Sequence, residues 1–222
     1  MRKPPKYVII GGGGRVGYRL AQLLLEKKLD VAIVERDKEV CERIASSLNA
    51  LVINGDCTSP KILEDAGARQ ADAFAGVTGD DSHNIVACHL AKHMFQVPLT
   101  LARVENPEMT KTAQETGIDF VFSPSHVSAF VLENAISLPG TVSILTSGTL
   151  TRAVETTIQG GCPAEGKLIK DLELPKNCVI GAIYRGRTII IPHGKTVLKR
   201  GDVVALIGEE EAIRGALKLF TK

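Results

Sequence analysis

The sequence predicts an α/β fold, with a parallel sheet in the N-terminal part and a smaller β-rich domain after it. Between Lys6 and Phe122, short β-branched segments alternate with stretches whose apolar residues recur at helical spacing, which is the pattern of repeated βαβ units. From Leu150 onward the apolar residues recur at every second position, in short segments. We therefore expect a doubly wound, six-stranded, Rossmann-like parallel sheet followed by a small, β-sandwich-like α+β module. The length of 222 residues suits one medium domain and a smaller one.

Strands and helices are expected to alternate through the N-terminal part. The expected strands are Tyr7–Ile10, Asp30–Glu35, Ala50–Asn54, Ala71–Val77, Leu99–Val104 and Phe120–Phe122. The expected helices are Val16–Lys27, Lys38–Leu48, Pro60–Ala66, Asp81–Phe95 and Pro107–Thr116. Two of these helices begin with a capping residue followed by proline, at Ser59 and Asn106, and Gly117 ends the last one.

A further helix is expected from Ser125 to Ser137. Its apolar residues recur at helical spacing and include Val127, Phe130, Val131 and, just beyond it, Leu138. A six-stranded doubly wound sheet does not need this helix. Two interpretations therefore stay open with equal weight: the helix packs on a partner, or it covers the last strand.

The C-terminal domain is expected to contain short strands and one terminal helix. We expect the domain boundary after residue 138, which gives domains 1–138 and 139–222. We interpret Thr141–Thr151 as a linker or a weak strand. The terminal helix, Glu209–Phe220, starts with acidic residues, which the helix macrodipole favours. The expected strands are Ala153–Ile158, Cys178–Arg185, Thr188–Pro192 and Asp202–Ile207, with a hairpin turn at Arg185–Arg187 and one helical turn within Gly166–Leu172.

The composition excludes several classes of protein. Apolar residues make up 44% and charged residues 23% of the chain, and the net charge is +2, so a disordered or polyelectrolyte chain is excluded. Aromatic residues are only 4%, without tryptophan, and they do not cluster with Lys and Arg, so no nucleic acid is expected as a partner. No apolar run reaches the roughly 18 to 20 residues that span a bilayer, and no signal peptide is indicated. We expect a soluble, cytoplasmic protein.

Cysteine and histidine spacing predicts no metal centre. The five cysteines form no C-x-x-C pair, and we interpret them as reduced thiols of the core. His89 and His93 lie four residues apart, a spacing that places two imidazoles on one helical face. No acidic residue lies between them, so an amphipathic helix is the better interpretation.

A glycine-rich loop carries the main chemical signal. It follows the first strand and opens the first helix, and it matches G-x-G-x-x-G with Gly12, Gly14 and Gly17. Gly12 permits a tight turn, Gly14 lets the backbone approach a pyrophosphate, and Gly17 lets helix and strand pack closely. The intervening candidate residues are Gly13, Arg15 and Val16.

The second strand adds an acidic residue to this fingerprint. Glu35 ends that strand 18 residues after Gly17, where a carboxylate accepts hydrogen bonds from the ribose hydroxyls of an adenosine. A carboxylate at this place disfavours the 2′-phosphate of NADP, although the neighbouring Arg36 leaves that possibility open. The combination predicts binding of NAD(H) or of an adenine nucleotide such as ATP, ADP or AMP.

Three further strands end in candidate ligand residues, because ligands of doubly wound sheets bind at the carboxyl ends of the strands. Asp56 is expected to reach the adenine amino group, and Arg103 is a candidate phosphate partner, or else forms an ion pair with Glu105 or Asp80. The other candidates are Cys57, Thr78, Gly79 and Asp80. The alternative for the Gly-Asp sequences is an ordinary strand-to-helix turn in which Asp80 or Asp81 caps the helix.

Catalytic signatures are lacking in the sequence. A dehydrogenase needs an acid or base beside the nicotinamide, yet none of the three tyrosines has a Tyr-x-x-x-Lys partner, and the chain has no G-x-S-x-G elbow. We therefore expect a protein that binds a nucleotide and does not turn it over. An NAD-dependent oxidoreductase and a stand-alone nucleotide or effector sensor remain as alternatives.

Several segments together resemble a known family. They are 8–21, 54–58, 71–81 with Asn84, and 102–108 in the first half, and 166–172, 189–194 and 198–204 in the second. The first half resembles the RCK or KTN (TrkA-N) domain of the Trk/Ktr potassium-uptake regulatory subunits, and the second half resembles their TrkA-C domain. The resemblance covers nearly the whole chain and is more specific than the glycine loop alone.

The resemblance implies a cytoplasmic gating subunit at the inner face of the membrane. It would bind NAD(H) or ATP/ADP and control a membrane potassium channel or transporter of the TrkH or KtrB kind. By the same resemblance, Gly12–Gly17 hold the phosphates, Glu35 the ribose and Asp56 the adenine side, while Thr78, Gly79 and Arg103 hold the distal part. Arg15 matches an arginine that helps to bind phosphate, often across a subunit interface. The helix from Ser125 to Ser137 matches a crossover helix between protomers.

The resemblance also implies an assembly. Relatives form homodimers and commonly octameric rings, and because this chain carries one copy of each half, a ring would need more protomers than in relatives with tandem copies. In some relatives the TrkA-C domain binds a cyclic dinucleotide or another small effector.

Overall fold

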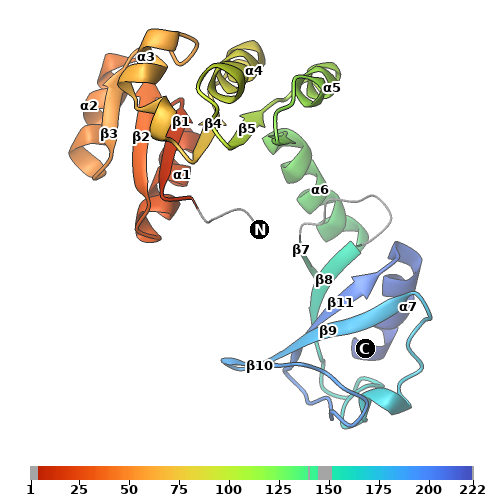
Figure 1. Ribbon diagram of the computed structural model, residues 1–222. Helices are drawn as coiled ribbons and strands as arrows, with labels where there is room; N and C mark the ends of the chain where they lie inside the picture. The colour runs from red at the N-terminus through yellow and green to blue at the C-terminus, as the bar shows by residue number, and fades with distance from the viewer. Residues whose placement is uncertain (1–4, 140, 145–151, 222) are drawn as a thin grey trace. The chain divides into compact units, whose positions relative to one another are not determined.

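A six-stranded parallel sheet forms the first part of the protein, whose computed structural model describes residues 5–139, 141–144 and 152–221 (Figure 1). The strand order is β3-β2-β1-β4-β5-β6, and every neighbouring pair is parallel. This order confirms the doubly wound sheet. Strands β2 and β3 are added on one side of β1 and strands β4 to β6 on the other, so the switch point lies between β1 and β4. The strands are β1 (Tyr7–Gly11), β2 (Asp30–Glu35), β3 (Leu51–Asn54), β4 (Ala73–Gly76), β5 (Leu99–Arg103) and β6 (Phe120–Phe122).

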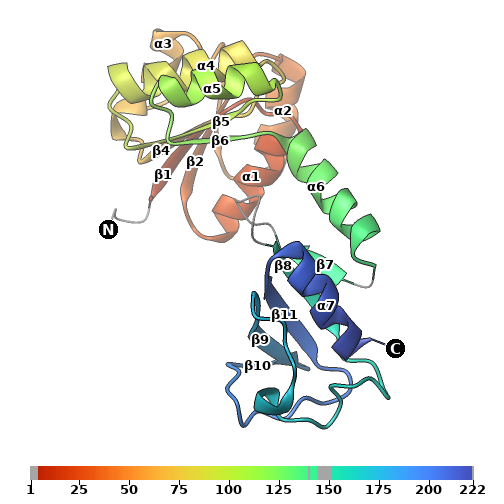
Figure 2. The same ribbon diagram turned by 90° about the vertical axis from the view of Figure 1, so that its right-hand side faces the viewer.

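Helices cover both faces of this sheet (Figure 2). They are α1 (Arg15–Glu26), α2 (Lys38–Ser47), α3 (Pro60–Asp65), α4 (Asp81–His89) and α5 (Pro107–Glu115). Side chains alternate along a strand, so Val8 and Ile10 pack with α1 and α2, while Ile9 packs in the second cluster with α3, α4 and α5. Because both faces are buried, the central strands are almost wholly apolar.

The fourth helix differs from its expected form. We predicted one α-helix from Asp81 to Phe95, but after His89 the chain continues as a π-helical turn, η2 (Leu90–Met94). Lys92 of this turn forms a 2.5 Å ion pair with Asp119, and His93 hydrogen-bonds the carbonyl of Thr116 at 3.1 Å. These partners are distant in sequence, so no local pattern could indicate the wider turn. A 3₁₀ turn, η1 (Ala68–Gln70), was also not predicted.

The two histidines at this turn lie close together. The ring centroids of His89 and His93 are 4.4 Å apart. In the described part of the chain, no group of three or more His, Cys, Asp or Glu side chains is arranged to hold a metal ion.

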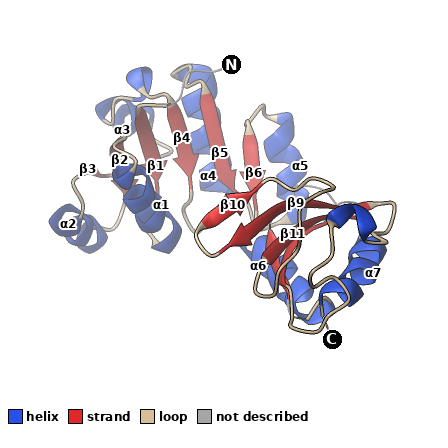
Figure 3. Ribbon diagram, turned by 90° about the horizontal axis from the view of Figure 1, so that it is seen from below, coloured by secondary structure: helices blue, strands red, loops and turns tan. Residues whose placement is uncertain are grey.

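The second part is built on one antiparallel sheet with the order β10-β9-β11-β8-β7, of which β10, β9 and β11 are labelled in Figure 3. The prediction of an α+β module is confirmed, but the sandwich-like form was wrong. Strand β11 pairs between β9 and β8, so all five strands join one sheet, and α7 (Glu210–Phe220) packs against it. The strands are β7 (Thr141–Ile144), β8 (Arg152–Thr157), β9 (Cys178–Arg185), β10 (Thr188–Ile190) and β11 (Val203–Gly208), and η3 (Ile169–Asp171) is the expected helical turn.

The segment Thr141–Thr151 is partly described. Its first four residues form β7, which pairs with β8 and agrees with the interpretation as a strand. Residues 145–151 lie outside the described residues.

Helix α6 (Pro124–Ser137) spans the division between the two compact units, 1–126 and 127–222. The expected domain boundary at residue 138 stays a prediction. In the second unit, Arg152 binds Glu133 of α6 at 3.0 Å and Glu210 of α7 at 2.7 Å. Val131, Leu132 and Ile136 of α6 are exposed, so the interpretation that this helix packs on a partner also stays open. No helix in the described residues is long and apolar enough to cross a membrane.

Candidate functional site

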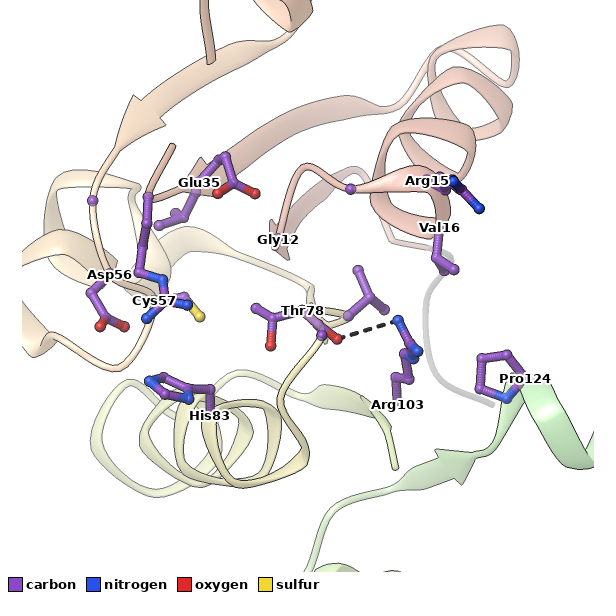
Figure 4. Close-up of a pocket in the computed structure, with 16 residues that line it drawn as sticks. Gly12, Arg15, Val16, Glu35, Asp56, Cys57, Thr78, His83, Arg103 and Pro124 are labelled. Carbon is purple, nitrogen blue, oxygen red and sulfur yellow. Dashed lines mark hydrogen bonds between the residues drawn. The ribbon is translucent and has the colours of Figure 1, made fainter. Parts of the chain in front are cut away.

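A cavity of about 460 Å³ lies at the carboxyl edge of the parallel sheet (Figure 4). The carboxyl ends of β2 and β5 and the loops that follow β1, β2, β3 and β4 line it, as expected for the switch point of a doubly wound sheet. The predicted residues that line it are Gly12, Gly14, Arg15, Val16, Glu35, Arg36, Asp56, Cys57, Thr78, Gly79 and Arg103. Gly13, Gly17 and Asp80 lie outside the lining. The lining residues that are not among the predicted site residues are Val34, Gly55, Val77, His83 and Pro124.

The three glycines of the loop have different tasks. Gly12 has φ +108°, and a Cβ there would lie 2.9 Å from the backbone nitrogen of Thr78. A Cβ at Gly17 would overlap the carbonyl oxygen of Gly12. A Cβ at Gly14, in contrast, would meet nothing within 4 Å, so this position faces open space in the pocket. Gly12 and Gly17 are thus required by the protein itself, and Gly14 is free for the approach of a ligand.

The start of α1 is suited to an anion. Gly14 is its N-cap and supplies no side-chain acceptor, and no acidic residue lies in the first turn. The N–H groups of the first turn therefore lack a capping side chain, and the helix dipole favours negative charge at this end. Arg15, which is exposed, adds a positive charge at the same place.

Glu35 is held by two backbone donors at the pocket edge. Its Oε2 accepts a 2.6 Å hydrogen bond from the N–H of Gly13, and its Oε1 accepts a 2.9 Å bond from the N–H of Asp37. These bonds fix the carboxylate and tie it to the glycine loop. Each oxygen keeps a second lone pair, with which it could accept a bond from a ribose hydroxyl.

The side chain of Asp56 is held by hydrogen bonds within its own loop. Its Oδ1 accepts bonds from both the N–H and the hydroxyl of Thr58, each at 2.8 Å. The backbone bond from Thr58 lowers the pKa of Asp56 below its ordinary value, and burial opposes this only in part. The carboxylate is therefore charged at neutral pH, and its second oxygen is available to accept a bond from an amino group. The Gly-Asp turn and a ligand role are compatible here.

A buried asparagine organises the loop after β4. Oδ1 of Asn84 accepts bonds from the N–H and the hydroxyl of Thr78, each at 2.8 Å, and its Nδ2 donates to the carbonyls of Thr78 at 3.2 Å and Arg103 at 2.9 Å. Asn84 is fully buried, so this one amide ties together two strand ends that line the pocket. Sequence reasoning did not assign it this role. The signal was an asparagine one turn into a helix that follows a Gly-Asp-Asp sequence.

Asp80 and Asp81 act on the backbone around the pocket. Asp80 is the N-cap of α4, and its Oδ1 accepts a 2.9 Å bond from the N–H of His83. Oδ2 of Asp81 accepts bonds from the N–H groups of Glu105 and Asn106, at 3.0 and 2.8 Å. Both carboxylates thus hold the loops after β4 and β5 in place.

His83 joins the lining between these loops (Figure 4). Its Nδ1 is shielded from solvent and lies 3.1 Å from Oδ1 of Asp80. His83 was not predicted as a site residue, because its contact with the pocket depends on where α4 begins.

The cysteines of the site are expected to be chemically inert. Burial raises the pKa of Cys57 to about 11 and that of Cys88 to about 12, so at pH 8 almost no thiolate forms at either position. All five cysteines are free and buried.

We predict negligible labelling of the native protein by iodoacetamide at pH 8, measured by intact mass, and full labelling in guanidinium chloride. Rapid labelling of Cys57 under native conditions would contradict this.

Comparison with known proteins gives consistent matches. The TrkA-N domain model matches residues 8–124, and the TrkA-C domain model matches residues 153–221. A Trk system potassium uptake protein TrkA homolog of Pyrococcus abyssi is 34% identical over 222 residues, which cover 97% of this chain and 98% of the relative. A protein of the same description from Methanothermobacter thermautotrophicus is 35% identical, covering 97% of this chain and 99% of the relative.

Solved structures show the same fold. The GsuK channel superposes with a TM-score of 0.69 at 16% identity, covering 100% of this chain and 40% of the channel chain. The GsuK channel bound to NAD gives 0.67 at 17% identity, again covering 100% and 40%. GsuK bound to ADP gives 0.52 at 27% identity, covering 59% of this chain and 34% of that one. The chain thus spans about two fifths or less of the length of these GsuK chains.

Proposed function

Since this chain belongs to the TrkA family of potassium-uptake proteins, with a TrkA-N domain followed by a TrkA-C domain, we propose that it is a nucleotide-binding regulatory subunit of a potassium transport system. The observation that carries the proposal is the pocket at the carboxyl edge of the parallel sheet. It combines an uncapped helix start at Gly14 with a fixed carboxylate at Glu35 and a charged one at Asp56.

In the binding mode that we propose, the adenine would lie toward Asp56 and the ribose hydroxyls would donate to Glu35. The phosphates would lie at the start of α1, with Arg15 and Arg103, which also line the pocket (Figure 4). The distal part of the ligand would lie against Thr78 and Gly79. A GsuK structure at 27% identity contains ADP, which supports an adenine nucleotide as ligand. ATP, ADP, AMP and NAD(H) all share the portion that this pocket would bind.

The proposed mechanism is a shift between conformations and does not involve turnover. A ligand that contacts one conformation better than another shifts the equilibrium between them, and the shift is passed to the membrane partner. We propose a TrkH- or KtrB-like potassium channel or transporter as that partner, and a homodimer or an octameric ring as the assembly, located at the cytoplasmic face of the membrane. Under the same proposal, a small effector would bind to the C-terminal domain.

Titration calorimetry with ATP, ADP, AMP, NAD and NADH tests the proposal. We expect at least two of these nucleotides to bind with unequal affinity. We also expect no reaction product of the nucleotide in the calorimeter cell after the titration. Conversion of NADH in the presence of a small carbonyl compound would favour the oxidoreductase alternative. A second experiment tests the membrane partner: purification of the protein from cells, followed by a search for a bound membrane protein. Nucleotide binding without such a co-purified membrane protein would favour a stand-alone sensor. No binding to any of the five would contradict the proposed function.

Arg15→Ala is expected to remove the discrimination between ATP and ADP. A terminal phosphate near Arg15 gives ATP a contact that ADP lacks, so its loss should reduce ATP affinity by about tenfold and ADP affinity less. Arg19→Ala is the matched control, because Arg19 lies one turn further on α1, outside the pocket lining, and hydrogen-bonds Gln22. Calorimetric dissociation constants measure the effect. Unchanged ATP affinity and an unchanged ATP/ADP ratio in Arg15→Ala would show that the contact is absent.

A further inference from the structure

The guanidinium of Arg103 is fixed on one side by Glu105. Nε and Nη2 of Arg103 donate to Oε1 of Glu105 at 3.2 and 2.9 Å. Nη1 makes only a 3.5 Å contact with the carbonyl of Thr78, the dashed line in Figure 4. A guanidinium carries two hydrogens on Nη1, so at least one N–H of Arg103 is available on its pocket side. Glu105 thus aims Arg103 at the pocket without lining it.

The second oxygen of Glu105 holds the first turn of α6. Oε2 accepts a 2.8 Å bond from the hydroxyl of Ser123 and a 3.2 Å bond from the N–H of Ser125. The same Ser123 oxygen accepts a 3.1 Å bond from the N–H of His126. This turn is the place where the chain passes from the first compact unit to the second.

Glu105 is charged and its backbone is anchored. Burial raises its pKa, but the bonds from Ser123, Ser125 and Arg103 outweigh burial, so the pKa lies below the ordinary value. Its N–H donates to both oxygens of Asp81 at 3.0 Å. One carboxylate therefore bridges a pocket arginine and the start of a helix, on a main chain that is held in place.

We propose that Glu105 is a positioning residue that couples phosphate binding at Arg103 to the first turn of α6. This inference rests on the proposed nucleotide function. A phosphate oxygen that accepts a bond from Nη1 fixes the guanidinium from both sides and so strengthens its two bonds to Glu105. A better-fixed Glu105 in turn holds Ser123 and Ser125 more firmly. Coupling between two sites is reciprocal, so the factor by which a bound phosphate favours the fixed first turn of α6 is also the factor by which fixing that turn strengthens phosphate binding. Loosening the turn should therefore weaken phosphate binding.

Two variants that do not line the pocket test the coupling by calorimetry with ADP and with adenosine. Glu105→Gln keeps the shape of the side chain but loses its charge, and should weaken ADP binding about tenfold. Ser123→Ala removes one bond to Glu105 and should weaken ADP binding about threefold to fivefold. Adenosine affinity should change in neither, since adenosine has no phosphate. Ser46→Ala, which removes an exposed hydroxyl bonded within α2, should change neither ligand.

Hydrogen exchange of the peptide 123–127, measured with and without ADP, distinguishes coupling from a merely structural role of Glu105. ADP should slow exchange of the Ser125 and His126 amides in the wild-type protein but not in Glu105→Gln. If Glu105→Gln does not fold, Ser123→Ala and the wild-type exchange decide the question.

Two failures are distinguishable. If the wild-type protein binds ADP, yet both variants bind it with wild-type affinity and ADP leaves exchange of 123–127 unchanged, the coupling is overturned while the proposed function stands. If the wild-type protein does not bind ADP or any other adenine nucleotide, the proposed function fails and the coupling fails with it.

Discussion

Gly17→Ala is expected to destabilise the protein strongly, whereas Gly14→Ala should fold normally and lose nucleotide affinity. A Cβ at Gly17 would overlap the Gly12 carbonyl oxygen, which is backbone and cannot move aside without opening the glycine loop. The clash should cost about 3 kcal/mol or more, the upper end for overpacking a core. At Gly14 the Cβ meets no protein atom within 4 Å, so the effect appears only when a ligand occupies that space.

Urea denaturation and calorimetry separate the two effects. We expect a lowered midpoint, or no cooperative transition, for Gly17→Ala. We expect a midpoint close to that of the wild type for Gly14→Ala, with affinity for ADP reduced about tenfold or more, equivalent to about 1.4 kcal/mol. A stable Gly17→Ala protein would contradict the packing argument. A Gly14→Ala protein with unchanged affinity for ADP would show that the phosphates of the ligand do not lie against this residue.

Asn84→Asp is expected to destabilise the first unit by about 3 kcal/mol. The side chains have nearly the same shape, but the carboxylate cannot donate to the carbonyls of Thr78 and Arg103, which its Nδ2 now satisfies. Two carbonyls would then face a buried oxygen with negative charge at a fully buried position. Because both carbonyls belong to residues that line the pocket, nucleotide affinity should fall as well.

Asn106→Asp is the matched control for this substitution. Asn106 caps α5 by accepting a bond from the N–H of Glu108 through its Oδ1, and aspartate caps a helix equally well. The control should therefore change the free energy of unfolding by less than about 0.5 kcal/mol. Chemical denaturation of both variants measures the difference. Equal stability of the two would show that the amide nitrogen of Asn84 contributes little.

Local patterns were sufficient for the elements of the fold and insufficient for some of their details. Strands such as Asp30–Glu35 were predicted with the bounds observed, because a short β-branched run bounded by polar residues has few alternatives. The end of α4 was not, because the π-turn at Leu90–Met94 accompanies bonds to Asp119 and Thr116, more than 20 residues away. The single sheet of the second unit likewise depends on β11 pairing with both β8 and β9.

The candidate site shows the same division. Arg103 was predicted both as a phosphate partner and, alternatively, as the ion-pair partner of Glu105. The structure has the ion pair and also places Arg103 in the lining of the pocket, so the two interpretations do not exclude each other. Asp80 was predicted both as a ligand residue and as a helix cap. It caps α4 and lies outside the lining, and its role toward a ligand stays a prediction.

The sequence by itself determined the class of the fold, the glycine loop with its acidic partner Glu35, and the family, because each is written in residues that are close in the chain or that follow a simple period. Only the tertiary structure decided which side chains meet: Asn84 with the carbonyl of Arg103, Glu35 with the N–H of Gly13, and Glu105 with both the pocket arginine and the start of α6. The physical reason is that periodicity specifies which face of a helix or strand is buried. Contacts between loops depend instead on the register and packing of strands that are neighbours in the sheet but distant in the sequence.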